Sequence, residues 1–333
     1  MSKAGDGLPK GEGPTDTGRP VKELDALAGN TRLSLVDLPF AVDAPIEVSD
    51  SPKLYAAAAG GLGWRNAELF IVGADGVTNE PIGQISASAT MGMVPEALAS
   101  SGLHIIDRKN KLLVQMQDGN MILNDADKAQ LLAGNNLAAI GQEIVQFGSA
   151  TPIGDNRYIV SYLLRGLGGT EGEMDGHVAD EDFILLQADD LTAIDPRYYV
   201  PFQSVTIAAL GRGDDVPISR SIDQPGRALK PWSPVHSRYA FNQDGDLEIS
   251  WTRRSRAGLM WLDNVETPLA EETERYRLLI NGQILAETGV PVAVLSAIEL
   301  QAYRDAGASN LSCEVRQIGR YNISDPLSFV VEI

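Results

Sequence analysis

The sequence predicts a mainly β protein, with a β-rich region followed by a separate β-sandwich at the C-terminal end. Glycine is frequent, at 33 of 333 residues. Runs that favour helices are scarce, and turn-forming residues recur about every ten residues. At roughly 100–200 residues per domain, the chain has room for about two domains with sizeable cores.

The first thirty residues are rich in glycine, proline and charge, and cannot bury enough apolar surface to fold alone. We therefore expect residues 1–30 to form an extended arm that a partner chain holds in place. The arm lacks the apolar centre of a signal peptide. The longest apolar stretches fall well short of the ~20 residues of a membrane span, so no membrane insertion is expected.

Residues 31–229 alternate between short apolar runs and turns. Segment 67–73 followed by Ala-Asp-Gly predicts a strand and turn, and 111–123 predicts a hairpin around Asp118-Gly119. Short helical turns are expected at 94–101 and 190–199. A division of this region into two subdomains near residues 125–135 is one option.

Residues 228–234 contain two prolines and predict a linker, after which residues 230–333 form a domain of their own. In segment 246–255 the alternating residues Leu247, Ile249 and Trp251 share one face. Segment 274–282 ends in an Asn-Gly turn. About seven short strands with a buried tryptophan in the second predict a fibronectin type III-like sandwich.

Ser296 and Glu299 form a capping box that predicts a helix start within this domain. The apolar side of that helix is expected to carry Ile298, Leu300 and Tyr303, and Gly307 is expected to end it. The single cysteine, Cys313, shares a face with Leu311 and Val315. It is expected to be an inert core thiol rather than a nucleophile.

The formal net charge is −18. Binding to the nucleic-acid backbone requires clustered Lys and Arg, so no nucleic-acid partner is expected. Docking on anionic lipid is also disfavoured. An acidic surface fits a soluble component of an assembly or one that meets basic partners.

Residues 163–172 (LLRGLGGTEG) raise the question of a phosphate-binding loop. Glu171 occupies the last required glycine position and would repel phosphate, and no helix follows. We therefore interpret the segment as a long surface loop ending a strand, whose glycines supply positive φ. Arg165 could pair with Glu171 across it.

No motif indicates catalysis, and we expect no catalytic residue, metal site or cofactor. His104, His177 and His236 are far apart, and neither HExxH nor CxxC occurs. His177 could hold a cation with the acids at 180–182, although a solvated acidic loop is the favoured interpretation. No GxSxG elbow is present. Carboxylate pairs are plentiful, but the tryptophans do not suggest a sugar-binding cleft.

Two short motifs have a structural and a functional interpretation. Arg212-Gly213-Asp214 spells an adhesion tripeptide, but its surroundings favour a turn. The basic cluster TRRSR (252–256) could meet an acidic neighbour, while a solvated strand end is the favoured interpretation.

Several segments occur in the same order in one family: WRNAELFIVGADG, NLAAIGQEIVQFGSAT, YIVSYLLRGLGGTE, PWSPVH and DLEISWTRRSR. Over roughly residues 35–333 the chain resembles the C-terminal part of the tail-tip hub proteins of siphophages and gene transfer agents. The most specific marker is the motif containing Arg165, Gly166, Gly169, Thr170 and Glu171.

The resemblance implies a homotrimeric structural hub at the distal end of a virion tail, assembled in the bacterial cytoplasm. Expected partners are other copies, the distal tail protein and the upstream hub. The glycosidase-like barrel of long family members is absent from this chain, so we carry over no enzymatic role. Either the hub is divided between genes or this chain is a fragment of a larger hub; the initiator methionine and hydrophilic arm favour a separate gene product.

Two alternatives stay open. The chain could be a receptor- or carbohydrate-binding module whose exposed aromatics, such as Trp261 or Tyr239, contact host glycan. A hydrolase on a β scaffold is the third hypothesis.

Overall fold

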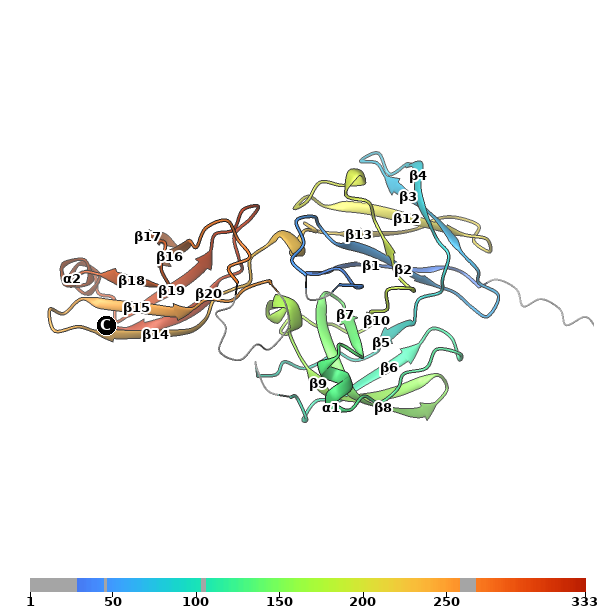
Figure 1. Cartoon of the computed structure of the whole chain (residues 1–333), viewed down its shortest axis with the longest axis horizontal. Coiled ribbons are helices and arrows are strands. Elements are labelled where there is room, and N and C mark those ends of the chain that lie inside the picture. Colours follow the sequence, from blue (N-terminus) through green and yellow to red (C-terminus); the bar gives the residue numbers. More distant parts are fainter. Residues whose placement is uncertain (1–28, 45–46, 103–105, 258–267) are drawn as a thin grey trace, which may run out of the picture.

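The computed structural model describes residues 29–44, 47–102, 106–257 and 268–333. Strands account for 43% of the described residues and helices for 9%, which confirms the mainly β fold class. Figure 1 shows three β bodies: two packed together at one end and an elongated sandwich at the other. Most of the expected arm (residues 1–28) lies outside the described residues.

A three-stranded sheet occupies the middle of the larger end. It contains β1 (Arg32–Asp37), β2 (Leu54–Ala59) and β11 (Thr192–Ala193), with β2 in the centre. Every residue of β2 is buried. One face of β1 and β2 packs on the second sheet of this end and the other on the barrel. The small side chains of LYAAAA fit a strand covered on both faces.

The second sheet has the order β13 (Ile218–Ile222), β12 (Val205–Gly211), β3 (Ala67–Val72) and β4 (Thr78–Ile85). The expected turn after 67–73 is present, because Gly73 and Val77 close the β3–β4 hairpin through a backbone hydrogen bond. Leu69 and Ile207 from this sheet and Leu33 and Leu54 from the middle sheet belong to one core.

Residues 91–185 form a closed barrel of six strands (Figure 1). The strands are β5 (Met91–Val94), β6 (Leu112–Met116), β7 (Leu137–Ile140), β8 (Glu143–Gly154), β9 (Arg157–Leu164) and β10 (Glu181–Leu185). Phe147 and Phe183 are fully buried in its core, with their ring centroids 6.2 Å apart. Helix α1 (Lys128–Leu132) connects β6 to β7, so the expected break near 125–135 falls between strands of one barrel.

Within residues 235–257 and 268–333, seven strands form the C-terminal sandwich. One sheet contains β14 (Val235–Phe241), β15 (Leu247–Thr252) and β18 (Val292–Leu295). The other has the order β17 (Gln283–Thr288), β16 (Tyr276–Ile280), β19 (Asn310–Gln317) and β20 (Leu327–Glu332). This three-plus-four arrangement is fibronectin type III-like. Trp251 in its second strand lies edge-on against Tyr276, with 5.2 Å between ring centroids.

Cys313 is fully buried in the sandwich core, and burial raises the pKa of its thiol to about 11. Its position in the core is as predicted, and the raised pKa favours the protonated, less nucleophilic form of the thiol.

Helix α2 (Ala297–Asp305) begins with the expected capping box of Ser296 and Glu299. Gly307, with φ of +85°, follows its end. Leu300 and Tyr303 pack on the core as predicted, but Ile298 is 85% exposed and its assignment to the buried face is wrong. A nine-residue helix over a small sandwich buries only a narrow side.

Two local predictions in residues 31–229 are also wrong. Segment 111–123 forms no hairpin, because β6 ends at Met116 and pairs with β5 and β9 instead. Residues 94–101 contain no helical turn. The short helical turn expected within 190–199 is present. It is the 3-10 turn η3 (Pro196–Tyr198), which Asp195 caps and which follows strand β11.

Candidate functional site

The loop that carries the marker motif leaves the barrel at the end of β9. We call residues 165–171 the motif loop. Gly166, Gly168 and Gly169 have φ values of 61°, 67° and 83°, so all three lie in the left-handed region that favours glycine. The predicted turn is therefore present. The prediction of a surface loop is wrong, because Arg165 and Thr170 are buried.

Arg165 pairs with Glu143 on strand β8, and the expected pairing with Glu171 is wrong. The Nε of Arg165 donates to Glu143 Oε1 at 2.8 Å, and its second terminal nitrogen donates to Oε2 at 2.8 Å. The backbone N–H of Gly166 donates to Oε1 at 2.7 Å. Glu143 is fully buried, so this bidentate pair is a charged contact in the interior.

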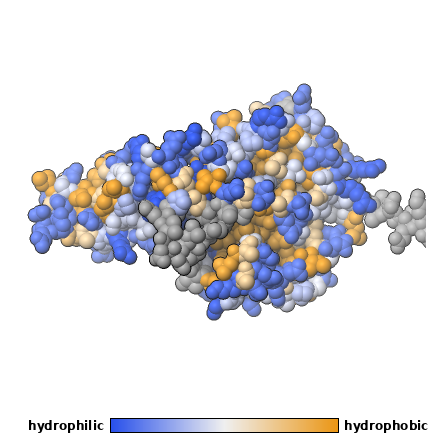
Figure 2. Space-filling model, in the orientation of Figure 1, coloured by the Kyte–Doolittle hydropathy of each residue, from blue (hydrophilic) through white to orange (hydrophobic). Residues whose placement is uncertain are grey.

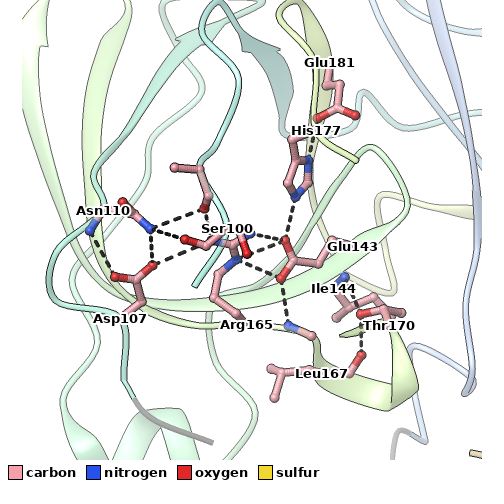
Figure 3. A network of polar contacts seen from close by, with 12 residues as sticks. Ser100, Asp107, Asn110, Glu143, Ile144, Arg165, Leu167, Thr170, His177 and Glu181 are labelled. Carbon is pink, nitrogen blue, oxygen red and sulfur yellow. Dashed lines mark hydrogen bonds and ion pairs between the residues drawn. The ribbon is translucent and has the colours of Figure 1, made fainter. Parts of the chain in front are cut away.

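His177 lies between two carboxylates, as Figure 3 shows. Its Nε2 is 2.7 Å from Glu143 Oε2 and its Nδ1 is 2.6 Å from Glu181 Oε2. The imidazole side chain is only 2% exposed. The prediction of a solvated acidic loop at this histidine is therefore wrong. The loop after the motif turns inward because the buried carboxylate of Glu143 needs donors.

Hydrogen bonds decide the protonation of this network. Burial lowers the pKa of His177, but its hydrogen bonds to Glu143 and Glu181 outweigh burial and raise it above 6.5. Burial raises the pKa of Glu143, yet donors from His177, Arg165 and Gly166 bring it below 4.5. The favoured state is an imidazolium between carboxylates, a structural ion cluster in which every ring nitrogen is engaged.

Asp107 completes the charged set on the other side of Arg165. One of its oxygens lies 3.6 Å from an Arg165 terminal nitrogen, and that nitrogen donates to the carbonyl of Ala99 at 3.0 Å. Asn110 donates to Asp107 through its backbone and its side chain (Figure 3). The network thus connects three barrel strands to the segment between β5 and β6.

The outer side of the motif loop contacts the C-terminal sandwich and the chain that leads to it. Glu171 forms an ion pair with Arg254, which lies just after β15. The Arg254 guanidinium lies over the Trp232 ring, 5.0 Å from its centroid. A Cβ at Gly169 would be 2.7 Å from Trp232, so only glycine allows this close approach.

Arg256 is buried at the same junction with Glu271, at 2.8 Å. Its terminal nitrogens also donate to the carbonyls of Ser49, Ala228 and Ala270. The favoured interpretation of TRRSR as a solvated strand end is therefore wrong, and its alternative, contact with acidic neighbours, is correct. The segment 228–234 connects the two regions as predicted, but Ala228 and Leu229 are buried within it.

Other residues singled out in the sequence have structural roles or lie outside the described residues. Asp214 accepts hydrogen bonds from the N–H groups of Thr31 and Gly211, which fits the predicted turn. His104 and Trp261 lie outside the described residues. Among the described residues, no group of His, Cys, Asp or Glu has the geometry of a metal site. None of the described helices is long and apolar enough to cross a membrane.

Sequence reasoning missed Glu143 and Trp232 as partners of the motif loop, and Arg256 as a buried residue of the domain junction. A signal existed for Glu143, since it is an isolated carboxylate within the otherwise apolar and amide-rich run 137–147. Such a charge in a barrel strand needs a buried partner. The contacts of Trp232 and Arg256 bring together segments far apart in sequence, and no local pattern encodes them.

A family model described as "Rcc01698-like, C-terminal" matches residues 89–184, which contain the motif loop and all but the last residue of the barrel. No curated protein matches the chain. Similar solved structures include two fibronectin type III domains of chicken tenascin, at 11% identity, covering 72% of this chain and 99% of that chain with a TM-score of 0.22. Domains d3–d4 of rat CD45 are 10% identical, covering 44% and 72%, with a TM-score of 0.23.

A fibronectin III array of RIM-binding protein is 12% identical over 93% of this chain and 97% of that chain, with a TM-score of 0.22. The assignment of the sandwich rests on its own strand order, given above.

Proposed function

We propose that this chain is a structural component of a tail tip or baseplate hub in a bacteriophage or phage-like particle, where it supports host attachment and genome delivery. The observation that carries the proposal is the two-sided motif loop. Its inner side is fixed in the barrel through Arg165 and Glu143, and its outer side holds the sandwich through Glu171 and Gly169.

This arrangement suits a rigid structural part. Two of the residues that mark the resemblance to tail-tip hubs, Gly169 and Glu171, contact the sandwich or the segment that leads to it. The motif loop lies within the part of the chain that the Rcc01698-like family model matches. The charged groups of the network are satisfied by one another, so they are poorly placed to attack a substrate. We infer a structural role without catalysis.

The test is the location of the chain in a purified particle. Particles from the bacterium that encodes it are labelled with an antibody against the sandwich and viewed by electron microscopy. We expect labelling at the distal tail end, and deletion of the gene should yield tails without a tip. Intact, infectious particles lacking the chain would contradict the proposal.

The resemblance also implies a homotrimer with the distal tail protein and the upstream hub as neighbours. Light scattering of the full chain mixed with those tail proteins should give a mass that includes three copies. A chain that stays monomeric in their presence would argue against the hub assignment. A trimer with no affinity for tail proteins would argue against the neighbours named.

A second candidate is a receptor- or glycan-binding module. Two aromatic residues of the edge strand β14 favour it: Tyr239 and Phe241 are 44% and 45% exposed. Amphipathic rings on an accessible strand suit contact with sugar faces. Binding to host-surface polysaccharide that Tyr239→Ala abolishes would support this role, and equal binding by the variant would remove it.

A further inference from the structure

A cavity of about 400 Å³ opens at the junction between the larger end and the sandwich. Its wall includes Asp37 of β1, the aromatic rings of Phe202 and Trp232, and residues of the sandwich such as Asn322. Cavities at domain junctions of this size commonly bind ligands or side chains. The motif loop borders it through Gly168 and Gly169.

Carboxylates outnumber cations in the wall. The acids are Asp37, Glu173, Asp223 and Asp325, and the bases are Arg227 and Lys230. Both bases are already engaged: Arg227 pairs with Glu173 at 2.7 Å, and Lys230 pairs with Asp325 at 2.5 Å. Among the described residues, Asp37 and Asp223 have no ion-pair partner of their own. This balance disfavours phosphates and other anions.

Asp37 in the cavity wall has a carboxylate oxygen that lacks a hydrogen-bond donor. The residue is only 6% exposed, and its Oδ2 accepts from the N–H groups of Gly226 and Arg227 at 2.8 Å each. Its Oδ1 has no hydrogen-bond donor among the described residues. A buried carboxylate oxygen without a donor is costly. Burial accordingly raises the pKa of Asp37.

We propose that this cavity receives an arginine side chain from a neighbouring protein. A guanidinium group brings a permanent positive charge and five N–H donors, enough to serve several carboxylates at once. The rings of Phe202 and Trp232 offer apolar contact for its methylene groups. A metal ion fits less well, since the described residues contain no cluster of His, Cys, Asp or Glu suited to one.

The proposal draws on the proposed function, because a tail component has neighbouring subunits. The net charge of −18 also favours basic partners. The test uses the isolated full chain. A negative binding result can therefore be distinguished from a failure to find the chain at the tail tip.

The probe is N-acetyl-arginine methylamide. It is titrated into the full chain labelled with 5-fluorotryptophan, and the fluorine NMR signals of the tryptophans are followed. The chain has four tryptophans, and Trp232→Phe identifies the signal of the one in the cavity wall. N-acetyl-citrulline methylamide has the same shape without the charge, and N-acetyl-lysine methylamide carries a point charge. We expect a saturable shift of the Trp232 signal with arginine, at least tenfold weaker binding of citrulline, and intermediate binding of lysine.

Asp223→Asn and Asp244→Asn form a matched pair that separates the cavity from general charge attraction. Each removes one exposed carboxylate, and only Asp223 lines the cavity. Asp223→Asn should weaken arginine binding several-fold, while Asp244→Asn should leave it unchanged. Equal binding of citrulline, equal effects of the two variants, or tighter binding of lysine than arginine would overturn the proposal.

Discussion

At the residue scale, the unusual feature is the charge buried inside the barrel. Glu143 is fully buried and accepts hydrogen bonds from Arg165, Gly166 and His177. A buried carboxylate is tolerated only when strong donors replace the water it loses. The favourable geometry of the Arg165 pair explains why an acid can occupy an interior position of β8.

Replacing this carboxylate tests the argument. Glu143→Gln leaves Arg165 buried without its main counter-charge, and we expect a loss of about 3–5 kcal/mol in the free energy of unfolding. Urea denaturation measures it. The control is Asp155→Asn, which breaks the exposed Arg157 pair and should cost no more than about 1 kcal/mol. Equal losses in both variants would contradict a special role for the buried pair.

His177 predicts a specific dependence of stability on pH. Because its folded-state pKa is raised above 6.5, its contribution is fully present below 6.5 and is lost as pH rises through the folded pKa. The free energy of unfolding should therefore fall on the alkaline side of pH 6.5. In His177→Gln this decrease of the free energy of unfolding with rising pH should disappear. Denaturation at acidic pH, which comes from protonation of carboxylates, should persist. A slope of the same size in the variant would exclude His177 as its source.

At the scale of elements, the motif loop shows how much the sequence reveals and where it stops. The glycines indicated left-handed turns, and Gly166, Gly168 and Gly169 adopt them. The capping box at Ser296 and the core face of β15 were also predicted, because hydrogen-bond spacing and strand alternation are local. Arg165 was assigned the nearest acid, Glu171, whereas its partner is 22 positions away on another strand. Local sequence cannot choose between partners that only the tertiary fold brings together.

The close approach of Gly169 to Trp232 gives a prediction for the loop. Gly169→Ala introduces a Cβ 2.7 Å from the indole and places alanine at φ of +83°. We expect a loss of about 1–3 kcal/mol in the free energy of unfolding, together with increased solvent exposure of Trp232. Denaturation and tryptophan fluorescence measure the two effects.

Gly172→Ala is the control, since a Cβ there has nothing within 4 Å. It should leave both the stability and the fluorescence close to those of the parent chain. If the two alanine variants behaved alike, contact with Trp232 would not explain the glycine at 169.

At the scale of the whole molecule, the question is whether the sandwich and the larger end behave as one body. In Figure 1 the sandwich extends away from the two packed β bodies. On the face shown in Figure 2, polar and apolar patches alternate. Relative motion of two domains is expected unless their interface is large and hydrophobic. Here the contacts include the ion pairs of Glu171 and Lys230, the Trp232 packing and the buried Arg256.

Arg256 is the residue whose loss should separate the two parts. It binds Glu271 and three carbonyls from both sides of the junction, and its side chain is only 4% exposed. Arg256→Met keeps the length of the side chain but removes every donor, which leaves Glu271 buried without its cation. We expect one thermal transition for the parent chain and two for Arg256→Met, with the sandwich and the larger end unfolding separately. Differential scanning calorimetry measures this, and small-angle scattering should show a broader distribution of shapes.

Arg275→Met removes an exposed partner of Glu287 within the sandwich and should preserve one transition. A single transition in Arg256→Met as well would mean that the remaining contacts are enough to couple the two parts.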